Sequence, residues 1–398
     1  MTQARNAGIA SFGASPAEVE ELLQYNINRF DLSLSSTLKF PLPDEPFLEV
    51  WRSYADEVSQ EGNLSAIYRW LPQLQFPIQE NLPSLPEYED AIKRGRFIYP
   101  NEVARGLNLN RPDLCRIAIH PTAAGQLPIL TADCRSDFVA LIRAFTKKGE
   151  PLPIPDSMGA VIITGYNNFH RIHMLRDAFL ANTHDEGSWT AEFARIKQQK
   201  NLYQDKFVIL GSGPYSGVSA SSLNQTEDEW IQMSLRIRLE HECTHYFTRR
   251  VFGSMQNNLI DELLADFLGI VSVTGSYNPK WALYFLGLED RLEYRRGGRL
   301  ENYRGTPPLT DGAFRVLQKI VRAAIANLEM LDQASRDHEK CFAYQAATIH
   351  SIASFTLDEL AVPDSGYRLT EKYYKFRTDL DEANIDKNSD DSNILNRR

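Results

Sequence analysis

The chain is poor in cysteine and has no apolar run long enough to cross a membrane. Its four cysteines, Cys115, Cys134, Cys243 and Cys341, are widely spaced, and no two of them form a C-x-x-C pair. A disulfide framework and a cysteine-based zinc site are therefore not expected. A transmembrane helix needs about 20 consecutive apolar residues, so we expect no membrane partner.

Basic residues are also scarce relative to acidic ones. The chain has 43 lysines and arginines against 52 aspartates and glutamates, a formal charge of −9. This balance argues against a nucleic-acid partner, which would require a concentrated basic stripe. The first ten residues lack the apolar segment of a secretory signal, and we therefore expect a cytoplasmic protein. No feature predicts its oligomeric state.

The pattern of apolar residues changes along the chain and predicts an α+β fold. Residues 1–110 have a mostly helical pattern, 111–275 alternate short strands with helices, 276–380 are helical again, and the polar segment 381–398 resembles a disordered tail. We expect strands at 116–120, 127–130, 160–164 and 206–210, and helices at 16–27, 65–74, 136–146, 169–180, 281–288, 312–331 and 339–355.

Eight histidines occur in 398 residues, and two of them lie in one chemically informative motif. The segment from His241 to His245 reads His-Glu-Cys-Thr-His, an H-E-x-x-H pattern. On a helix, residues four apart project from one face, so both imidazoles can bind the same metal ion. Glu242 is placed to take a proton from a water molecule beside that ion. The spacing is that of a zinc hydrolase.

The flanking residues predict two helices around this motif. Thr226 and Glu229 form a capping box ahead of a helix that should end near Val251. A second helix, 259–271, is apolar nearly all round, yet it carries Glu262 and Asp266 four residues apart. Two carboxylates on a buried helix are costly unless a positive group lies opposite them. A metal held by the two histidines would be such a group.

These two helices resemble those of the gluzincins, zinc metallopeptidases of the thermolysin-like clan, in which a helix with E-x-x-x-D follows the H-E-x-x-H helix. The resemblance covers residues 226–272. It implies that Glu262 is the third zinc ligand and that Asp266 orients a ligating histidine, His241. It also implies a zincin-like lobe at 111–275, in which a mixed sheet packs against the motif helix, with a helical C-terminal lobe at 276–380.

The predicted function is that of a zinc metallopeptidase acting on a peptide or protein substrate. Zn²⁺ is expected on His241, His245 and Glu262, and Glu242 would act as the general base and then pass its proton to the leaving amine. A donor from the C-terminal lobe should stabilise the oxyanion. Four residues are candidates for that donor: Tyr294, Tyr303, His338 and His350.

Other interpretations stay open. The protein could be a zinc hydrolase of a non-peptide amide or small molecule, or a scaffold or regulatory protein that retains the fold without activity. The two carboxylates could instead be structural and pair with Arg238, Arg249 or Arg250. A second metal site on His170, His173 and His184 has helical spacing but no accompanying carboxylate pattern.

The glycine-rich stretch 211–217 does not match a phosphate-binding loop. No lysine follows its glycines, and Pro214 removes a backbone donor. The next residues, 218–221, are expected to be extended. They could pair with a substrate backbone as an added strand, or form an ordinary loop.

Overall fold

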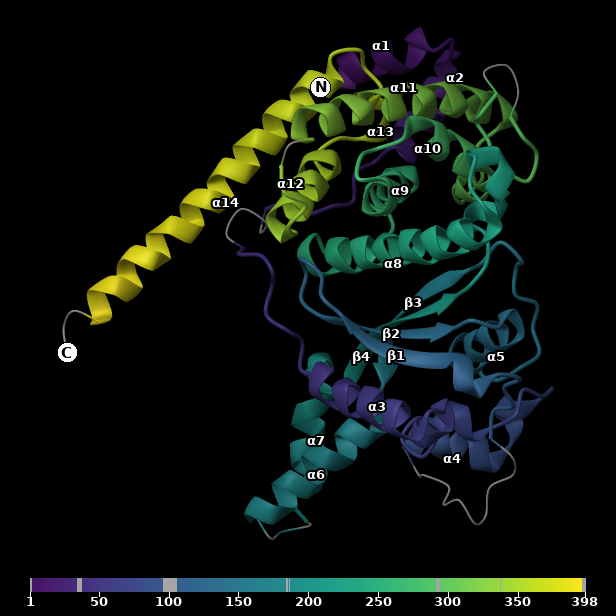
Figure 1. Ribbon diagram of the computed structural model, residues 1–398, viewed down its shortest axis with the longest axis vertical. Helices are drawn as coiled ribbons and strands as arrows, with labels where there is room; N and C mark the ends of the chain where they lie inside the picture. The colour runs from purple at the N-terminus through teal and green to yellow at the C-terminus, as the bar shows by residue number, and fades with distance from the viewer. Residues whose placement is uncertain are drawn as a thin grey trace. The chain divides into compact units, whose positions relative to one another are not determined.

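The structure is a computed structural model that describes residues 2–33, 38–95, 106–183, 185, 187–290, 294–336 and 338–395. It confirms an α+β protein, with helices and a four-stranded mixed sheet (Figure 1). The helices are α1 (Thr2–Ser11), α2 (Pro16–Tyr25), α3 (Leu48–Glu61), α4 (Pro86–Arg94), α5 (Arg135–Thr146), α6 (Phe169–Thr183), α7 (Trp189–Lys197), α8 (Glu227–Val251), α9 (Leu259–Thr274), α10 (Pro279–Leu286), α11 (Asp311–Ser335), α12 (Phe342–Ala353), α13 (Leu357–Leu360) and α14 (Ser365–Leu395). The strands are β1 (Cys115–His120), β2 (Leu127–Ala132), β3 (Ala160–Asn167) and β4 (Gln204–Gly211).

Internal contacts divide the chain into two units whose segments alternate along the sequence. Unit 1 contains Met1–Leu42, Thr122–Ala124 and Pro214–Arg398, and unit 2 contains Pro43–Pro121 and Gly125–Gly213. All four strands belong to unit 2, whereas α8 and α9, which carry the two motifs, belong to unit 1. These units do not follow the predicted segments 1–110, 111–275 and 276–380. The reason is that the first helices, α1 and α2, pack against α13 and α11 near the other end of the chain.

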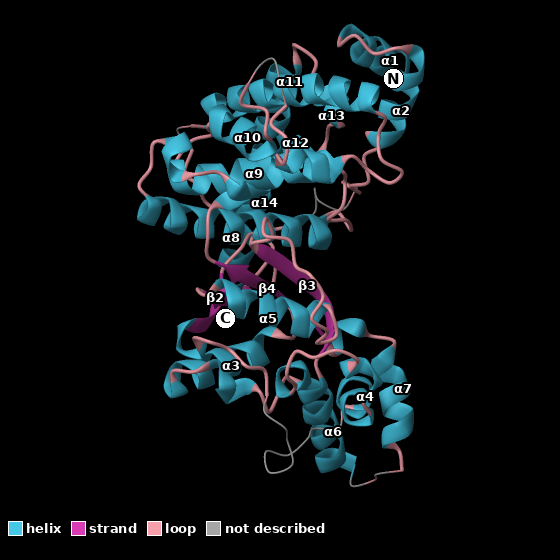
Figure 2. Ribbon diagram, turned by 90° about the vertical axis from the view of Figure 1, so that its right-hand side faces the viewer, coloured by secondary structure: helices cyan, strands magenta, loops and turns pink. Residues whose placement is uncertain are grey.

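Unit 2 is built on the sheet, whose strand order is β1-β2-β4-β3. β1 is antiparallel to β2, β2 is parallel to β4, and β3 is antiparallel to β4. Helices α3 and α5 pack against these strands (Figure 2). Large aromatic side chains fill the core between them, among which Trp51, Tyr54, Phe138 and Phe207 are fully buried. Each of the four strands contains the segment for which the sequence predicts a strand.

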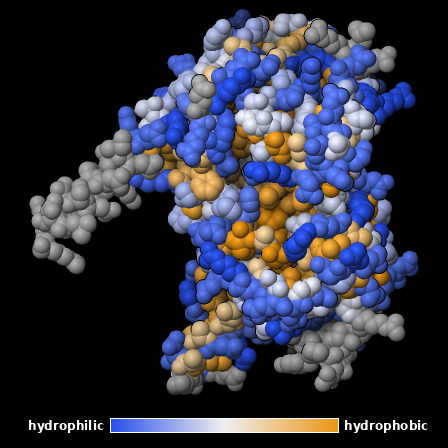
Figure 3. All heavy atoms as spheres, in the orientation of Figure 1, coloured by the Kyte–Doolittle hydropathy of each residue, from blue (hydrophilic) through white to orange (hydrophobic). Residues whose placement is uncertain are grey.

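The helices α6 and α7 of unit 2 contact each other through aromatic rings. Phe179 contacts Trp189, and Trp189 contacts Phe193, with ring centroids 5.8 and 5.6 Å apart. Met174 of α6 is exposed, and hydrophobic side chains are visible on this helix pair at the lower left of Figure 3.

The structure gives His170 and His173 of α6 structural partners. His170 stacks on Trp70 with ring centroids 3.9 Å apart and forms a hydrogen bond with the hydroxyl of Tyr54. His173 forms a hydrogen bond with the carbonyl of Gly95. The third residue of the suggested second metal site, His184, lies outside the described residues.

Unit 1 contains the two motif helices. The predicted capping box is present at Thr226 and Glu229, and α8 ends at Val251 as expected. α9 lies against α8, and Gly269 allows the close approach, since a Cβ there would lie 3.0 Å from the carbonyl oxygen of Ile237. At the end of the chain α14 extends to Leu395, through most of the segment 381–398 for which the sequence predicts disorder (Figure 1).

One local prediction is wrong, and another is confirmed only in part. Residues 65–74 form two 3₁₀ turns, Leu64–Ile67 and Pro72–Gln75, in place of a helix, because proline at 72 cannot donate a helical hydrogen bond. Of the segment 218–221 that was expected to be extended, Val218 and Ser219 are extended, but Ala220–Leu223 forms a 3₁₀ turn, which the hydroxyl of Ser219 caps by accepting from the N–H of Ser222. Among the described helices none is long and apolar enough to span a membrane.

Candidate metal centre

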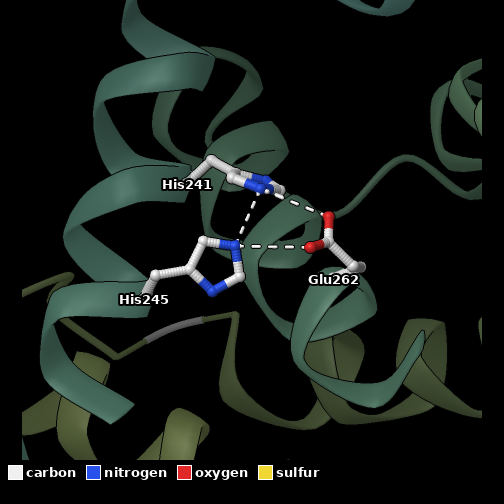
Figure 4. A group of neighbouring side chains, drawn as sticks. All are labelled: His241, His245 and Glu262. Atoms are coloured by element: carbon white, nitrogen blue, oxygen red, sulfur yellow. Dashed lines mark hydrogen bonds and ion pairs between the residues drawn. The ribbon is translucent and has the colours of Figure 1, made fainter. Parts of the chain in front are cut away.

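The two histidines of α8 and a glutamate of α9 meet in the interior of unit 1 (Figure 4). His241 and His245 project from one face of α8 because they are four residues apart, and Glu262 faces them from the first turn of α9. Both imidazoles are buried, and Glu262 is half-buried. The structure therefore brings together the three residues that the sequence predicts as ligands.

The separations of the three ligand atoms are close to those expected around a tetrahedral zinc ion. The Nε2 atoms of His241 and His245 lie 3.1 Å apart. Glu262 places Oε2 3.4 Å from Nε2 of His241 and Oε1 3.6 Å from Nε2 of His245. A tetrahedral zinc ion with bonds of about 2.05 Å has ligand atoms about 3.3 to 3.4 Å apart. Two imidazoles and a carboxylate are also a zinc donor set, so these residues fit the ion.

The second nitrogen of His241 is held by two groups. Its Nδ1 lies 3.0 Å from Oδ1 of Asp266 and 2.9 Å from the hydroxyl of Tyr215. Tyr215 also donates a hydrogen bond of 2.7 Å to the same Asp266 oxygen. In contrast, Nδ1 of His245 is buried and has no hydrogen-bond partner among the described residues. The orientation of His241 is therefore more tightly determined than that of His245.

A half-buried arginine, Arg299, completes this arrangement. Arg299 donates from Nη1 to the hydroxyl of Tyr215 over 2.7 Å, and from Nη2 to Oδ2 of Asp266. Burial opposes ionisation of Asp266, but the positive charge of Arg299 and the hydrogen bond with His241 outweigh it and lower the pKa of this carboxyl. Asp266 thus remains a carboxylate and an acceptor.

The glutamate of the cluster is held from the opposite side by a tyrosine. The hydroxyl of Tyr303 donates to Oε2 of Glu262 over 2.6 Å. The carbonyl of Tyr303 accepts a hydrogen bond of 2.6 Å from the hydroxyl of Tyr25, in α2. A chain of hydrogen bonds therefore connects the N-terminal helices to the candidate ligand.

The electrostatics of the two histidines differ. Burial disfavours the charged form of His241, but its hydrogen bonds to Asp266 and Glu262 outweigh this effect and raise its pKa to about 10. Burial and the charge of His241 together lower the pKa of His245 to about 4. Without a metal, His241 is therefore protonated at neutral pH and His245 is neutral. A metal ion that binds here must displace that proton.

The other residues of the H-E-x-x-H motif lie beside the two histidines on α8. Glu242 is half-buried on α8, directly after His241. Cys243 is a buried free thiol. Asp266 forms an ion pair with Arg299, which is not one of the arginines, Arg238, Arg249 and Arg250, that the structural alternative named.

Of the four candidates for stabilising an oxyanion, Tyr303 reaches the cluster. Tyr294 donates to the carbonyl of Gly298, and His338 forms a hydrogen bond with Tyr373. His350 stacks on the ring of Phe376 with centroids 3.9 Å apart. In the described part of the chain these three residues have no hydrogen bond to His241, His245 or Glu262.

Sequence patterns did not indicate Tyr215 and Arg299. Tyr215 lies in the glycine-rich stretch before α8, and Arg299 lies in a 3₁₀ turn after α10 (Arg299–Tyr303). Neither belongs to a motif or to a periodic segment. The available signals were weak: for Tyr215 the glycine-rich stretch itself, and for Arg299 the charged segment 289–304, which could lie over the site or simply be solvated.

Taken together, fold and site define an α+β protein in which two adjacent helices bring two histidines and a glutamate to one buried point. The chain belongs to DUF7005, a family of unknown function, whose model matches residues 7–364 and so includes both helices. No curated protein and no solved structure matches the chain.

Proposed function

We propose that this protein is a zinc metallopeptidase of the gluzincin type, with Zn²⁺ held by His241, His245 and Glu262. The observation that carries the proposal is the set of separations between the three ligand atoms, 3.1, 3.4 and 3.6 Å, which suit a tetrahedral ion. The carboxylate of Asp266 on Nδ1 of His241 adds support, because ligating histidines commonly donate their other N–H to a carboxylate.

The reaction assigns separate tasks to the side chains. A zinc ion bound at this point would lower the pKa of a water molecule and polarise a substrate carbonyl. Glu242, next to His241 on α8, accepts the proton from the attacking water and passes it to the leaving amine. Tyr303 is the candidate donor to the oxyanion, because its hydroxyl reaches the cluster; it would have to exchange its present hydrogen bond to Glu262, of 2.6 Å, for one to the substrate.

The zincin-like fold and a cytoplasmic location belong to the same proposal. The mixed sheet β1 to β4 and the helix pair α8 and α9 are the parts that a zincin lobe requires. The four cysteines are free, which suits a reducing compartment.

The direct test is zinc content, measured by elemental analysis on wild type, Glu262→Ala and Glu242→Gln. We expect about one zinc ion per chain in wild type and in Glu242→Gln, and a much lower content in Glu262→Ala, which loses a ligand. Glu240→Gln, the same substitution two residues earlier on α8, serves as the matched control and should retain zinc. Wild type that binds no zinc after reloading would overturn the proposal.

Turnover separates a peptidase from the other classes. Zinc-loaded wild type and Glu240→Gln should cleave members of a broad peptide library, whereas Glu242→Gln should lose at least about 10²-fold in rate, because it lacks the general base. Cleavage confined to small non-peptide amides would instead identify a small-molecule hydrolase. Zinc binding without turnover of either substrate class would identify a scaffold.

A further inference from the structure

The hydroxyl of Tyr215 lies where three other polar side chains of unit 1 meet. It is 2.9 Å from Nδ1 of His241, 2.7 Å from Oδ1 of Asp266 and 2.7 Å from Nη1 of Arg299. Tyr215 is 5% exposed, so water does not compete freely for these contacts. A buried hydroxyl with three partners has both its donor and its acceptors in use.

The chemistry of the partners determines where each proton lies. Arg299 has only donors, so the oxygen of Tyr215 accepts from it. The carboxylate of Asp266 has only acceptors, so Tyr215 gives it the single hydroxyl proton. Tyr215 then has no proton left for His241, and Nδ1 of that ring must itself be the N–H, shared between Tyr215 and Asp266. Once a metal ion displaces the extra proton of the ring, the lone pair of His241 is consequently on Nε2, which faces His245 and Glu262.

We propose that Tyr215 is a positioning residue for His241, selecting the tautomer that binds a metal through Nε2, and that Arg299 holds Tyr215 and Asp266 in place for this task. The inference rests on the proposed zinc site and extends it to two residues outside both motifs. Arg299 is suited to this role because its planar fork spans two acceptors, the hydroxyl of Tyr215 and Oδ2 of Asp266.

The backbone around Tyr215 is arranged to keep its hydroxyl in this position. The N–H of Tyr215 donates to Oγ of Ser234 on α8 over 2.9 Å, and its ring packs edge-on against Phe285 of α10 with centroids 4.8 Å apart. Gly217 follows with a φ of +67°, a conformation that favours glycine and turns the chain towards α8. The glycine-rich stretch thus places the hydroxyl of Tyr215 beside His241.

The test compares zinc dissociation constants, measured by competition with a chromophoric chelator, for wild type, Tyr215→Phe and Tyr277→Phe. The phenylalanine variant at 215 retains the ring but loses the hydroxyl, and we expect its Kd for zinc to rise about 10- to 100-fold. Tyr277→Phe is the matched control, because Tyr277 is another buried tyrosine of unit 1 whose hydroxyl has no partner among the described residues. Its Kd should equal that of wild type.

A spectroscopic measurement distinguishes positioning from a general loss of stability. With Co²⁺ in place of zinc, the visible absorption bands of Tyr215→Phe should differ from those of wild type, because the orientation of His241 changes, while Tyr277→Phe should give the wild-type bands. If Tyr215→Phe does not fold, Arg299→Lys takes its place. This variant keeps the positive charge but lacks the planar guanidinium group that reaches two acceptors, so it should also weaken zinc binding and alter the cobalt bands.

The possible outcomes separate this inference from the proposed function. If wild type binds zinc and Tyr215→Phe, or Arg299→Lys in its place, binds it equally tightly with unchanged cobalt bands, the positioning role is overturned and the zinc site stands. If wild type binds no zinc, the proposed function fails and the inference fails with it.

Discussion

Asp261 and Glu262 are neighbours in the chain, yet their carboxyls respond to burial in opposite ways. Burial and the charge of Glu262 raise the pKa of Asp261, whose Oδ1 is buried without a hydrogen-bond partner among the described residues. Burial also opposes ionisation of Glu262, but the hydrogen bond and charge of His241 outweigh it and lower its pKa. Glu262 is therefore a carboxylate ready to bind a cation, while Asp261 retains its proton.

Asp261→Asn should make the metal-free protein more stable, by an amount that grows with pH. Above about pH 3.9 the unfolded chain releases the Asp261 proton that the folded chain retains, so wild type loses stability as pH rises. The loss is about 1.4 kcal/mol for each pH unit in which only the folded state holds the proton. Asparagine cannot titrate, so the Asp261→Asn variant does not lose this stability. Urea denaturation with a chelator present, at pH 4, 5.5 and 7, measures the difference.

The control for this prediction is Asp177→Asn, which changes an exposed aspartate on α6. Its stability should follow wild type at every pH. The prediction is contradicted if the difference in unfolding free energy between Asp261→Asn and wild type stays constant from pH 4 to 7.

At the scale of elements, the site depends on how closely α9 approaches α8. A Cβ on Gly269 would lie 3.0 Å from both the carbonyl oxygen and Cγ2 of Ile237, so the two helices touch through backbone at this point. Glu262 lies two turns earlier on the same face of α9. The spacing of the helices at Gly269 therefore sets the distance of Glu262 from the two histidines.

Gly269→Ala should destabilise the protein and weaken zinc binding together. The added methyl group forces α9 away from α8, at a cost of about 1 to 3 kcal/mol for overpacking, and it moves Glu262 with the helix. Thermal melting of the metal-free protein and the zinc Kd measure the two effects.

Gly8→Ala is the control for Gly269→Ala, and it should not lower stability. Gly8 lies in α1, where a Cβ would meet Val362 at an ordinary 3.9 Å. Alanine should there increase stability by up to about 1 kcal/mol and leave zinc binding unchanged. A stable Gly269→Ala variant with wild-type affinity would show that the helix spacing does not matter to the site.

The elements that the sequence predicted well are those with local signals. The capping box at Thr226 and the i, i+4 spacing of the histidines predicted α8 and its metal-facing side, because both signals act within one or two helical turns. The contacts of Tyr215 and Arg299 join residues 26 and 33 positions apart, from loops without periodicity. No pattern of spacing predicts such contacts, since they depend on how the helices pack.

At the scale of the whole molecule, the N-terminal residues belong to the unit that contains the site. The carbonyl of Tyr25 accepts a hydrogen bond from Asn258, and Nδ2 of Asn257 donates to Asn28 over 2.7 Å. Residues 257 and 258 form the turn that begins α9, where Asn258 has a φ of +55°. The sequence predicted helices for the N-terminal region but not this contact, because composition carries no information about which distant segments meet.

Deleting residues 2–30 should therefore weaken zinc binding, although every ligand and Glu242 remain in the chain. The turn at 257–258 loses its partners, and Tyr303 loses the hydroxyl of Tyr25 that holds its carbonyl 2.6 Å away. Asn28→Ala removes part of the same contact, and a buried polar group left unpaired costs about 1 to 3 kcal/mol, so its melting temperature and zinc affinity should fall between those of the deletion and wild type. A deletion variant that folds and binds zinc with the wild-type Kd would show that α9 holds Glu262 in place without the N-terminal segment.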